Sequence, residues 1–292
     1  MVLSLNLMTK ISACLIVKNE KDLLGRCLES IRDADELVVC DTGSSDETVE
    51  IAESFGAKIV YFNWCDDFAA ARNFVKNQAS NEWILSIDAD EFLEPGGMEK
   101  IRRAIDTCKE DSINILMKPE AGYGQHHLAR VFRKESEWVG RVHEVIKYPS
   151  SAYCNVKITY GYSPAHELDP DIDMRILESI EDPTPRDLYY LAREYFYRQR
   201  WQDTVDLIEQ RYLPVASWMP ERADAWLMMS RALWQMSRGE EARTACLQAI
   251  NNNAHFKEAL VFMGEISWAD NRMMWWKMSE FADNRNVLFI RN

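Results

Sequence analysis

The sequence lacks long hydrophobic runs, paired-cysteine motifs and an excess of basic residues. None of its apolar segments approaches the roughly 18 consecutive residues that a transmembrane helix needs. Its seven cysteines form no Cys-x-x-Cys pair and are odd in number, which argues against a disulfide framework or a zinc site. Residues 1–10 show no basic segment before their few leucines, so no signal peptide is expected and the predicted location is cytoplasmic.

Acidic residues outnumber basic ones, with 47 Asp and Glu against 34 Lys and Arg and a net charge of −13. A broad nucleic-acid surface is therefore disfavoured unless the basic residues cluster locally. The 292 residues are 47% hydrophobic, which is enough for one large or two small globular domains.

Short apolar runs alternate with amphipathic segments over the first ninety residues. The runs, which predict strands, are at 11–17, 36–40, 58–62 and 82–87. The amphipathic segments, which predict helices, are at 21–32, 45–56 and 68–77. This alternation predicts a doubly wound α/β sheet with right-handed crossovers.

Acidic residues follow the predicted strands. Glu20 comes shortly after the first strand, Asp41 directly follows the second, and Asp88 and Asp90 follow the fourth. In such sheets ligands bind beyond the carboxyl ends of the strands, so these side chains are expected to converge. Converging carboxylates repel each other and lose hydration, a cost that a cation or a donor-rich ligand offsets. Asp-Ala-Asp at a strand end suits Mg²⁺ or Mn²⁺ on a diphosphate, and a solvated acidic loop is the alternative.

The ordered set ISACLIVKNE, VVCDTGSSDET, DDFAAARN and LSIDADE resembles the family 2 glycosyltransferases of the GT-A fold, over about residues 10–95. The resemblance implies a Rossmann-like doubly wound mixed sheet. It also implies metal-dependent, inverting transfer of a sugar from a nucleotide sugar, with UDP-glucose or UDP-N-acetylglucosamine as the expected donor. Thr42 departs mildly from the family pattern, since the second residue of this loop is commonly an aspartate.

Roles carried over from the family fall on the residues after the strands. Asp41 would bind the base, and Glu20 would lie near the nucleoside. Asp88 would serve the ribose and the metal, and Asp90 would hold the metal. Gly43, between Asp41 and a new helix, favours close approach of the ligand, although it is alternatively a simple turn glycine.

Arg72, in AAARN, also matches a family element beside the nucleotide. A guanidinium there would pair with phosphate or hold the acidic loops in place. The alternative is an ion pair with Asp67 on the same helix. Asp66 and Asp67 are predicted to cap that helix, and Asp67 is held in reserve as a second candidate base.

The tract LARVFRKESEWVGRVHEVI, residues 128–146, resembles an element of a family 2 subgroup with C-terminal helical repeats, which includes peptide S-glycosyltransferases. Inverting transfer needs a base that deprotonates the acceptor, and Glu144 is the candidate, with a structural glutamate as the alternative. His143 is a candidate metal ligand or a neighbour of the ligands. Thr159 replaces a histidine of many members, which puts that residue's role in doubt, although His166 lies seven residues later.

A change of composition at 179–187 predicts a catalytic domain over 10–180 and a helical domain over 181–292. Segments 227–250 and 260–276 align at a shift of about 34 residues, the tetratricopeptide (TPR) period. This alignment places Ser230 over Gly264 at the small position of the repeat. An earlier copy places Ala192 there, so about three stacked helix pairs are predicted.

Eleven aromatic residues of the repeats are predicted to be mostly core. They are Tyr189, Tyr190, Tyr195, Phe196, Tyr197, Trp201, Trp226, Trp234, Trp268, Trp275 and Trp276. The concave face would select a peptide or protein acceptor, or drive dimerisation; modified nucleic acid is a less favoured acceptor. Two alternatives to the transferase stay open. One is a non-catalytic scaffold with a vestigial pocket. The other is a sugar nucleotidyltransferase, although the loop KNEKDLLG lacks that class's glycine-rich motif.

Overall fold

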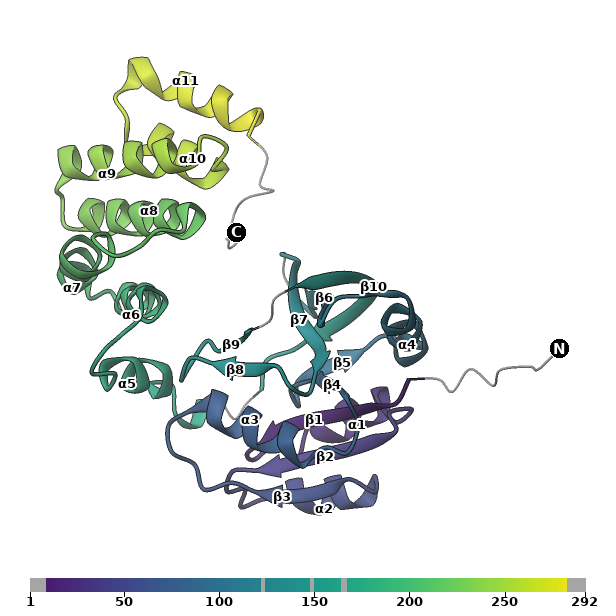
Figure 1. The fold of residues 1–292 in the computed structure, drawn as a ribbon. Coiled ribbons are helices and arrows are strands. Elements are labelled where there is room, and N and C mark those ends of the chain that lie inside the picture. The colour runs from purple at the N-terminus through teal and green to yellow at the C-terminus, as the bar shows by residue number, and fades with distance from the viewer. Residues whose placement is uncertain (1–8, 122–123, 148–149, 164–166, 283–292) are drawn as a thin grey trace. The chain divides into compact units, whose positions relative to one another are not determined.

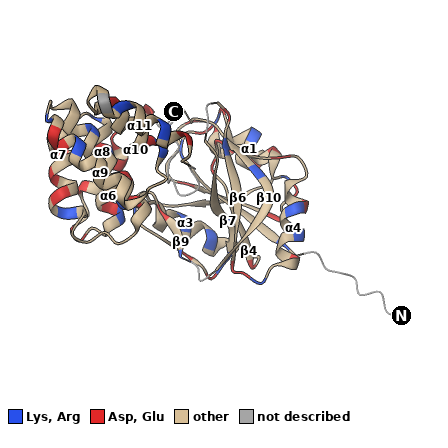
Figure 2. Cartoon of the chain, turned by 90° about the horizontal axis from the view of Figure 1, so that it is seen from above, with Lys and Arg blue, Asp and Glu red and all other residues tan. Residues whose placement is uncertain are grey.

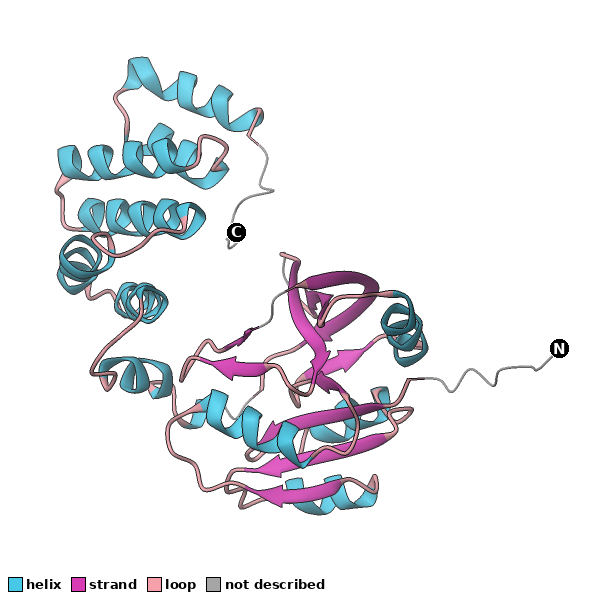
Figure 3. Ribbon diagram, viewed as in Figure 1, coloured by secondary structure: helices cyan, strands magenta, loops and turns pink. Residues whose placement is uncertain are grey.

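The computed structural model describes residues 9–121, 124–147, 150–163 and 167–282, except for the side chain of Asp270. The chain forms two compact units that divide between Ile172 and Asp173 (Figure 1). Within the described residues, the strands all belong to the first unit and the second is built of helices (Figure 3). His166 lies outside the described residues.

The first unit contains an eight-stranded mixed sheet in the order β3-β2-β1-β4-β7-β6-β10-β5. Its strands are β1 (Ile11–Val17), β2 (Glu36–Asp41), β3 (Lys58–Tyr61), β4 (Trp83–Ser86), β5 (Glu91–Leu93), β6 (Ser112–Pro119), β7 (His126–Arg133) and β10 (Ser151–Tyr160). The first four are parallel, whereas β7 runs antiparallel to both β4 and β6. The predicted α/β class is confirmed, and the first four strands agree with the prediction to within one residue at each end.

The strand register brings the predicted site residues to one edge of the sheet. Val17, the last residue of β1, pairs with Asp41 of β2, and Asp41 pairs in turn with Tyr61 of β3. On the other side of β1, Cys14 pairs with Ser86 at the end of β4. The loops that follow β1, β2 and β4 therefore leave the sheet at the same edge, as ligand binding in a doubly wound sheet requires.

Both faces of the sheet are covered, which explains why its central strands are continuous apolar runs. Along β1, Ile11, Ala13 and Leu15 belong to the core on the face of α1 (Leu24–Ser30), α2 (Thr48–Ser54) and α4 (Gly97–Thr107). Cys14 belongs to the opposite core. That core is completed by α3 (Phe68–Gln78) and by the hairpin of β8 (Glu137–Val139) and β9 (Val145–Lys147) (Figure 1).

The second unit consists of consecutive helices. They are α5 (Ile172–Glu178), α6 (Pro185–Tyr197), α7 (Trp201–Leu207) with a π-helical end (Ile208–Tyr212), α8 (Met219–Gln235), α9 (Gly239–Asn252), α10 (Lys257–Ile266) and α11 (Ala269–Glu280). The helix α6 starts with Thr184 as its cap, in a reciprocal capping box with Asp187, and with Pro185 in its first turn. The six helices α6–α11 form the three predicted pairs.

The small positions of the repeat are buried where helices cross. Ala192 and Ser230 are completely buried, and the Ser230 hydroxyl donates to the carbonyl oxygen of Ala242 at 2.6 Å. A Cβ atom built on Gly264 would lie 2.4 Å from Cδ1 of Trp276. The 34-residue spacing between Ser230 and Gly264 therefore marks positions where a larger side chain would keep neighbouring helices apart.

The prediction that the repeat aromatics are mostly core is wrong for several of them. Tyr189 and Tyr190 are buried, but Tyr197, Trp234 and Trp268 are 53%, 41% and 69% exposed. Helical spacing alone cannot tell an inward face from a surface stripe, because both repeat every three to four residues. In Figure 2, basic and acidic residues are interspersed on the helices of the second unit, as on a solvated helical surface.

All seven cysteines are free thiols, and four of them are buried. Among the helices that the structure describes, none is both long and apolar enough to cross a bilayer. The cytoplasmic location stays a prediction.

Replacing Gly264 by alanine should lower the free energy of unfolding by about 1–3 kcal/mol, since the new Cβ would clash with the Trp276 ring. Gly25→Ala is the matched control. This glycine is also helical, but its added Cβ would have its nearest neighbour at 3.9 Å, and alanine favours a helix by roughly 1 kcal/mol. Urea unfolding followed by circular dichroism measures both variants. Equal stability of the two would contradict the packing role of Gly264.

Candidate active site

The loop after β2 is closed by the Asp41 carboxylate. Asp41 is buried, and its oxygens accept hydrogen bonds from the amides of Gly43 at 3.1 Å and Ser44 at 3.0 Å. Gly43 has φ +111°, a left-handed conformation that favours glycine, and no atom lies within 4 Å of the position of a Cβ. The loop therefore presents open backbone beside a fixed carboxylate, which suits the approach of a flat, polar ligand.

Glu20 lies in the adjoining loop after β1. Its amide donates to Oγ1 of Thr48 at 2.8 Å, and its carboxylate accepts from the Ser163 hydroxyl at 2.8 Å. Burial raises the pKa of Glu20 to about 7, and the negative charges of Asp90 and Asp88 add to the rise. Burial and the neighbouring carboxylates therefore both favour the protonated form of Glu20.

Asp88 lies between two buried arginines. Its Oδ1 contacts Nη1 of Arg72 at 2.8 Å, and its Oδ2 contacts Nη2 of Arg130 at 3.0 Å. Burial acts to raise the pKa of Asp88, but the two guanidiniums outweigh it and hold that pKa well below the usual range. Asp88 is therefore an ionised carboxylate with both oxygens engaged.

A four-residue turn, which consists of Asp88, Ala89, Asp90 and Glu91, leads from β4 into β5. The Glu91 amide donates to the Asp88 carbonyl at 3.0 Å, and the Asp88 amide donates to Oε2 of Glu91 at 2.9 Å. The main-chain oxygen of Asp90 accepts from the Gly161 amide at 2.8 Å. Buried Glu91 also pairs with Arg130, but burial and the charges of Asp88 and Asp90 raise its pKa to about 7.

Glu144 is held by Arg72. Nε of Arg72 contacts Oε1 of Glu144 at 2.5 Å, the Glu144 side chain is 11% exposed, and the guanidinium lies 5.1 Å over the ring of Trp138. Arg72 thus pairs with Asp88 and Glu144, and the proposed alternative of a pair with Asp67 is wrong. Asp67 instead accepts from the Ala70 amide at 2.8 Å and caps α3, as predicted.

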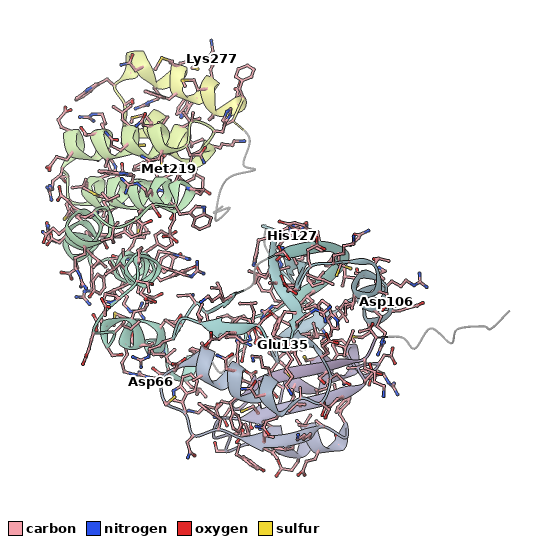
Figure 4. All side chains as sticks on the ribbon, viewed as in Figure 1. Asp66, Asp106, His127, Glu135, Met219 and Lys277 are labelled. Atoms are coloured by element: carbon pink, nitrogen blue, oxygen red, sulfur yellow. The ribbon has the colours of Figure 1, made fainter. Side chains whose placement is uncertain are left out.

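A cavity of about 300 Å³ joins these groups on the face of the hairpin β8–β9. Its lining includes Arg72, Asp88, Arg130, Trp138, His143 and Glu144. His143 has φ +52°, a conformation that non-glycine residues adopt rarely and often at functional sites. His127, on β7 and labelled in Figure 4, also lines the cavity. The structure therefore brings Glu144, His143 and Asp88 together, while Asp67 is not part of this lining.

Residues 12–147 match the sequence model described as glycosyl transferase family 2. They form a family 2 glycosyltransferase domain. This domain contains the acidic loops, the turn of Asp88 to Glu91, and all of the cavity described above.

Relatives of the family 2 domain differ in how much of this chain they cover. A TPR repeat-containing protein of Synechococcus elongatus is 41% identical over 134 residues, 44% of this chain and 33% of that protein. The SPbeta prophage-derived glycosyltransferase SunS of Bacillus subtilis is 28% identical over 221 residues, 68% of this chain and 52% of SunS. The chain thus spans a third to about half of the length of these relatives.

A solved structure is also similar to the chain. The crystal structure of S. aureus TarS 1-349 in complex with UDP-GlcNAc covers 86% of this chain and 91% of that one. Its TM-score is 0.46 and its sequence identity is 15%.

Glu91 and Arg130 are not among the site residues that the sequence predicts. Both are nearly inaccessible charged residues, with 4% and 7% exposure. Their signal was a charge next to apolar strand residues, in DEFL and in LARVF, which is rare unless the charge is paired. Thr159 lies on β10 and pairs with Phe92 of β5. Phe92 directly follows Glu91, the last residue of the acidic turn.

Replacing Glu20 by glutamine should stabilise the metal-free family 2 domain at pH 8 by roughly 1 kcal/mol, after allowance for the partial exposure of this group. The folded pKa of about 7 lies above the usual 4.5, so the folded state binds the proton more tightly. The resulting stability is complete below about pH 4.5 and is lost as the pH rises through 7. Glutamine stays neutral at every pH, so the variant keeps this stability at pH 8.

Urea unfolding with EDTA at pH 5 and pH 8 measures this difference, with Glu53→Gln, at an exposed position of α2, as the control. The free energy of unfolding should fall more from pH 5 to pH 8 in the wild type than in Glu20→Gln. An equal change in the two proteins would contradict the raised pKa of Glu20.

Proposed function

We propose that the protein transfers a sugar from a nucleotide-sugar donor to a hydroxyl or thiol acceptor, with a divalent metal and inversion at the anomeric carbon. The observation that carries the proposal is the cavity in which Arg72 joins Glu144 to Asp88. Arg72 contacts both the proposed base, Glu144, and the first aspartate of the Asp-Ala-Asp motif, and all three lie in the family 2 domain. The bounds proposed for the two domains are 10–180 and 181–292.

The donor is proposed to lie along the loops after β1 and β2. Asp41 would bind the base, Gly43 would allow close approach, and Glu20 would face the nucleoside. UDP-glucose and UDP-N-acetylglucosamine are the proposed donors. Support comes from the open backbone at Gly43 and from the position of Asp41 and Glu20 at the carboxyl ends of neighbouring strands.

The acidic turn fits a hard divalent cation, Mn²⁺ or Mg²⁺, because it offers carboxylate oxygens at a strand end. Burial first, and the neighbouring carboxylates second, raise the pKa of Glu20 and of Glu91, and a bound cation would offset the charge of those carboxylates. Asp88 and Asp90 are the proposed ligands, with His143 as a third. Since both oxygens of Asp88 contact guanidiniums, Asp90 would be the principal one. A bound cation would stabilise negative charge on the departing diphosphate.

Glu144 is proposed to accept the proton of the attacking hydroxyl or thiol. As that proton moves to the carboxylate, the acceptor oxygen or sulfur bonds to the anomeric carbon. The bond from this carbon to the diphosphate oxygen breaks, and its electron pair leaves with the diphosphate. Arg72, in contact with both Asp88 and Glu144, would keep the base oriented.

The acceptor is proposed to be a peptide or protein that the helical repeats select, with modified nucleic acid less favoured. Trp234 and Trp268 are exposed and would be available to such an acceptor. Homodimerisation through the repeats stays a prediction.

A titration panel separates the transferase from its alternatives. Calorimetry with UDP-sugars, GDP-sugars and free nucleotides, each with Mn²⁺ and with EDTA, should show metal-dependent binding of one nucleotide sugar. Binding of none would favour the scaffold with a vestigial pocket. A sugar nucleotidyltransferase would instead bind a nucleoside triphosphate and release pyrophosphate.

Replacing Asp90 by asparagine should abolish Mn²⁺-dependent binding of UDP, because it removes the principal carboxylate ligand. The thermal unfolding temperature without metal should change little, since one charge leaves a cluster already rich in negative charge. Exposed Asp22→Asn is the matched control and should bind UDP like the wild type. A large fall in unfolding temperature for Asp90→Asn would instead make this residue structural.

Replacing Glu144 by glutamine should leave UDP-sugar affinity unchanged but slow transfer about 10²–10⁴-fold, because glutamine keeps an acceptor for Arg72 without the basic carboxylate. Release of UDP from the bound donor, with water or an identified acceptor, measures the rate. Asp67→Asn is the matched control, since asparagine preserves the cap of α3. Loss of transfer in Asp67→Asn alone would move the base to Asp67.

A further inference from the structure

Arg130 bridges the two ends of the acidic turn. One nitrogen, Nη2, contacts Oδ2 of Asp88 at 3.0 Å and also pairs with Oε1 of Glu91. The same two residues are joined by the hydrogen bond from the Glu91 amide to the Asp88 carbonyl. Asp90 lies between them, so the backbone that carries its carboxylate is fixed at both sides.

The arginine reaches the turn from a distant part of the chain. It lies on β7, whose Val131 pairs with Leu85 of β4, the strand that leads into the turn. Arg130 is 42 residues from Asp88 and only 7% exposed. The antiparallel insertion of β7 beside β4 therefore brings the guanidinium of Arg130 to a turn that contains three acids.

Fold stability alone does not explain this arginine. Its Nε is buried and has no hydrogen-bond partner within the described chain, and unpaired buried donors destabilise a fold. Replacing a buried ion pair by apolar residues is often neutral or stabilising. The contacts of Nη2 with both ends of the metal-binding turn supply a functional reason for its presence.

We propose that Arg130 is a positioning residue of the donor site, which holds the turn from Asp88 to Glu91 so that Asp90 faces the diphosphate and its metal. This role rests on the proposed function. It acts through Asp88 and Glu91, not through contact with the reacting atoms. Residues behind metal ligands typically change metal affinity or activity by 10- to 100-fold when replaced.

The test compares Arg130→Gln with the double variant Arg130→Gln/Glu91→Gln. The single variant leaves Glu91 buried without its cation and is expected to unfold at a lower temperature. The double variant removes both charges and should unfold near the wild-type temperature. Both should bind UDP with Mn²⁺ roughly 10- to 100-fold more weakly by calorimetry, because Asp88 has lost one of its two guanidiniums.

Two further variants bracket the effect. Arg130→Lys should recover part of the affinity, since a single nitrogen makes both ion pairs in the wild type and one ammonium can reach both carboxylates. Arg133→Gln is the matched control on the same strand. Arg133 pairs with Glu82 and Asp111 away from the turn, so its replacement should leave UDP affinity unchanged.

The outcomes separate this role from the proposed function. Wild-type affinity for UDP and Mn²⁺ in the double variant would overturn the positioning role and leave Arg130 as a partner of Glu91 only. Failure of the wild-type protein itself to bind UDP with Mn²⁺ would overturn the proposed function, and this inference with it. If the double variant unfolds at the wild-type temperature but binds UDP and Mn²⁺ more weakly, the result supports the positioning role of Arg130.

Discussion

The contact of Asp88 with two guanidiniums is the interaction on which the rest of the site depends. Arg72 comes from α3 and Arg130 from β7, so the carboxylate ties a helix and an inserted strand to the end of β4. Guanidiniums as deeply buried as those of Arg72 and Arg130 persist only when they are paired. The same contacts fix Glu144, through Arg72, and the turn that carries Asp90, through Glu91 and Arg130.

The site divides its charge between two regions. On the cavity side, two arginines hold the pKa of Asp88 well below its usual range. In the loops after β1 and β2, burial and neighbouring acids raise the pKa of Glu20 to about 7. Carboxylates of two neighbouring loops therefore differ in pKa because their surroundings differ, and the side without guanidiniums is the one that a cation and a polar donor would stabilise.

The two units are stabilised by different physics. In the first, a sheet with both faces covered excludes water from its central strands, so a charged side chain within a strand, such as Arg130 on β7, is paired with acids at a strand end. In the second, small residues such as Ala192 and Ser230 let successive helices pack closely, while large aromatic residues such as Trp268 remain on the surface. The proposed catalytic residues lie in the first unit, and the proposed selection of an acceptor rests on the second.

The sequence by itself determined the strand and helix pattern, the acidic loops after β1, β2 and β4, and the 34-residue repeat, because periodicity and strand ends are local properties. It also favoured Asp67 as a cap, which the Ala70 amide confirms. Only the tertiary structure decided that Arg130 meets Asp88 and that Glu144 meets Arg72. The first contact depends on β7 pairing antiparallel to β4, and the second on the hairpin of β8 and β9 packing against α3. Such pairings join residues far apart in the chain, and packing rather than local pattern selects them.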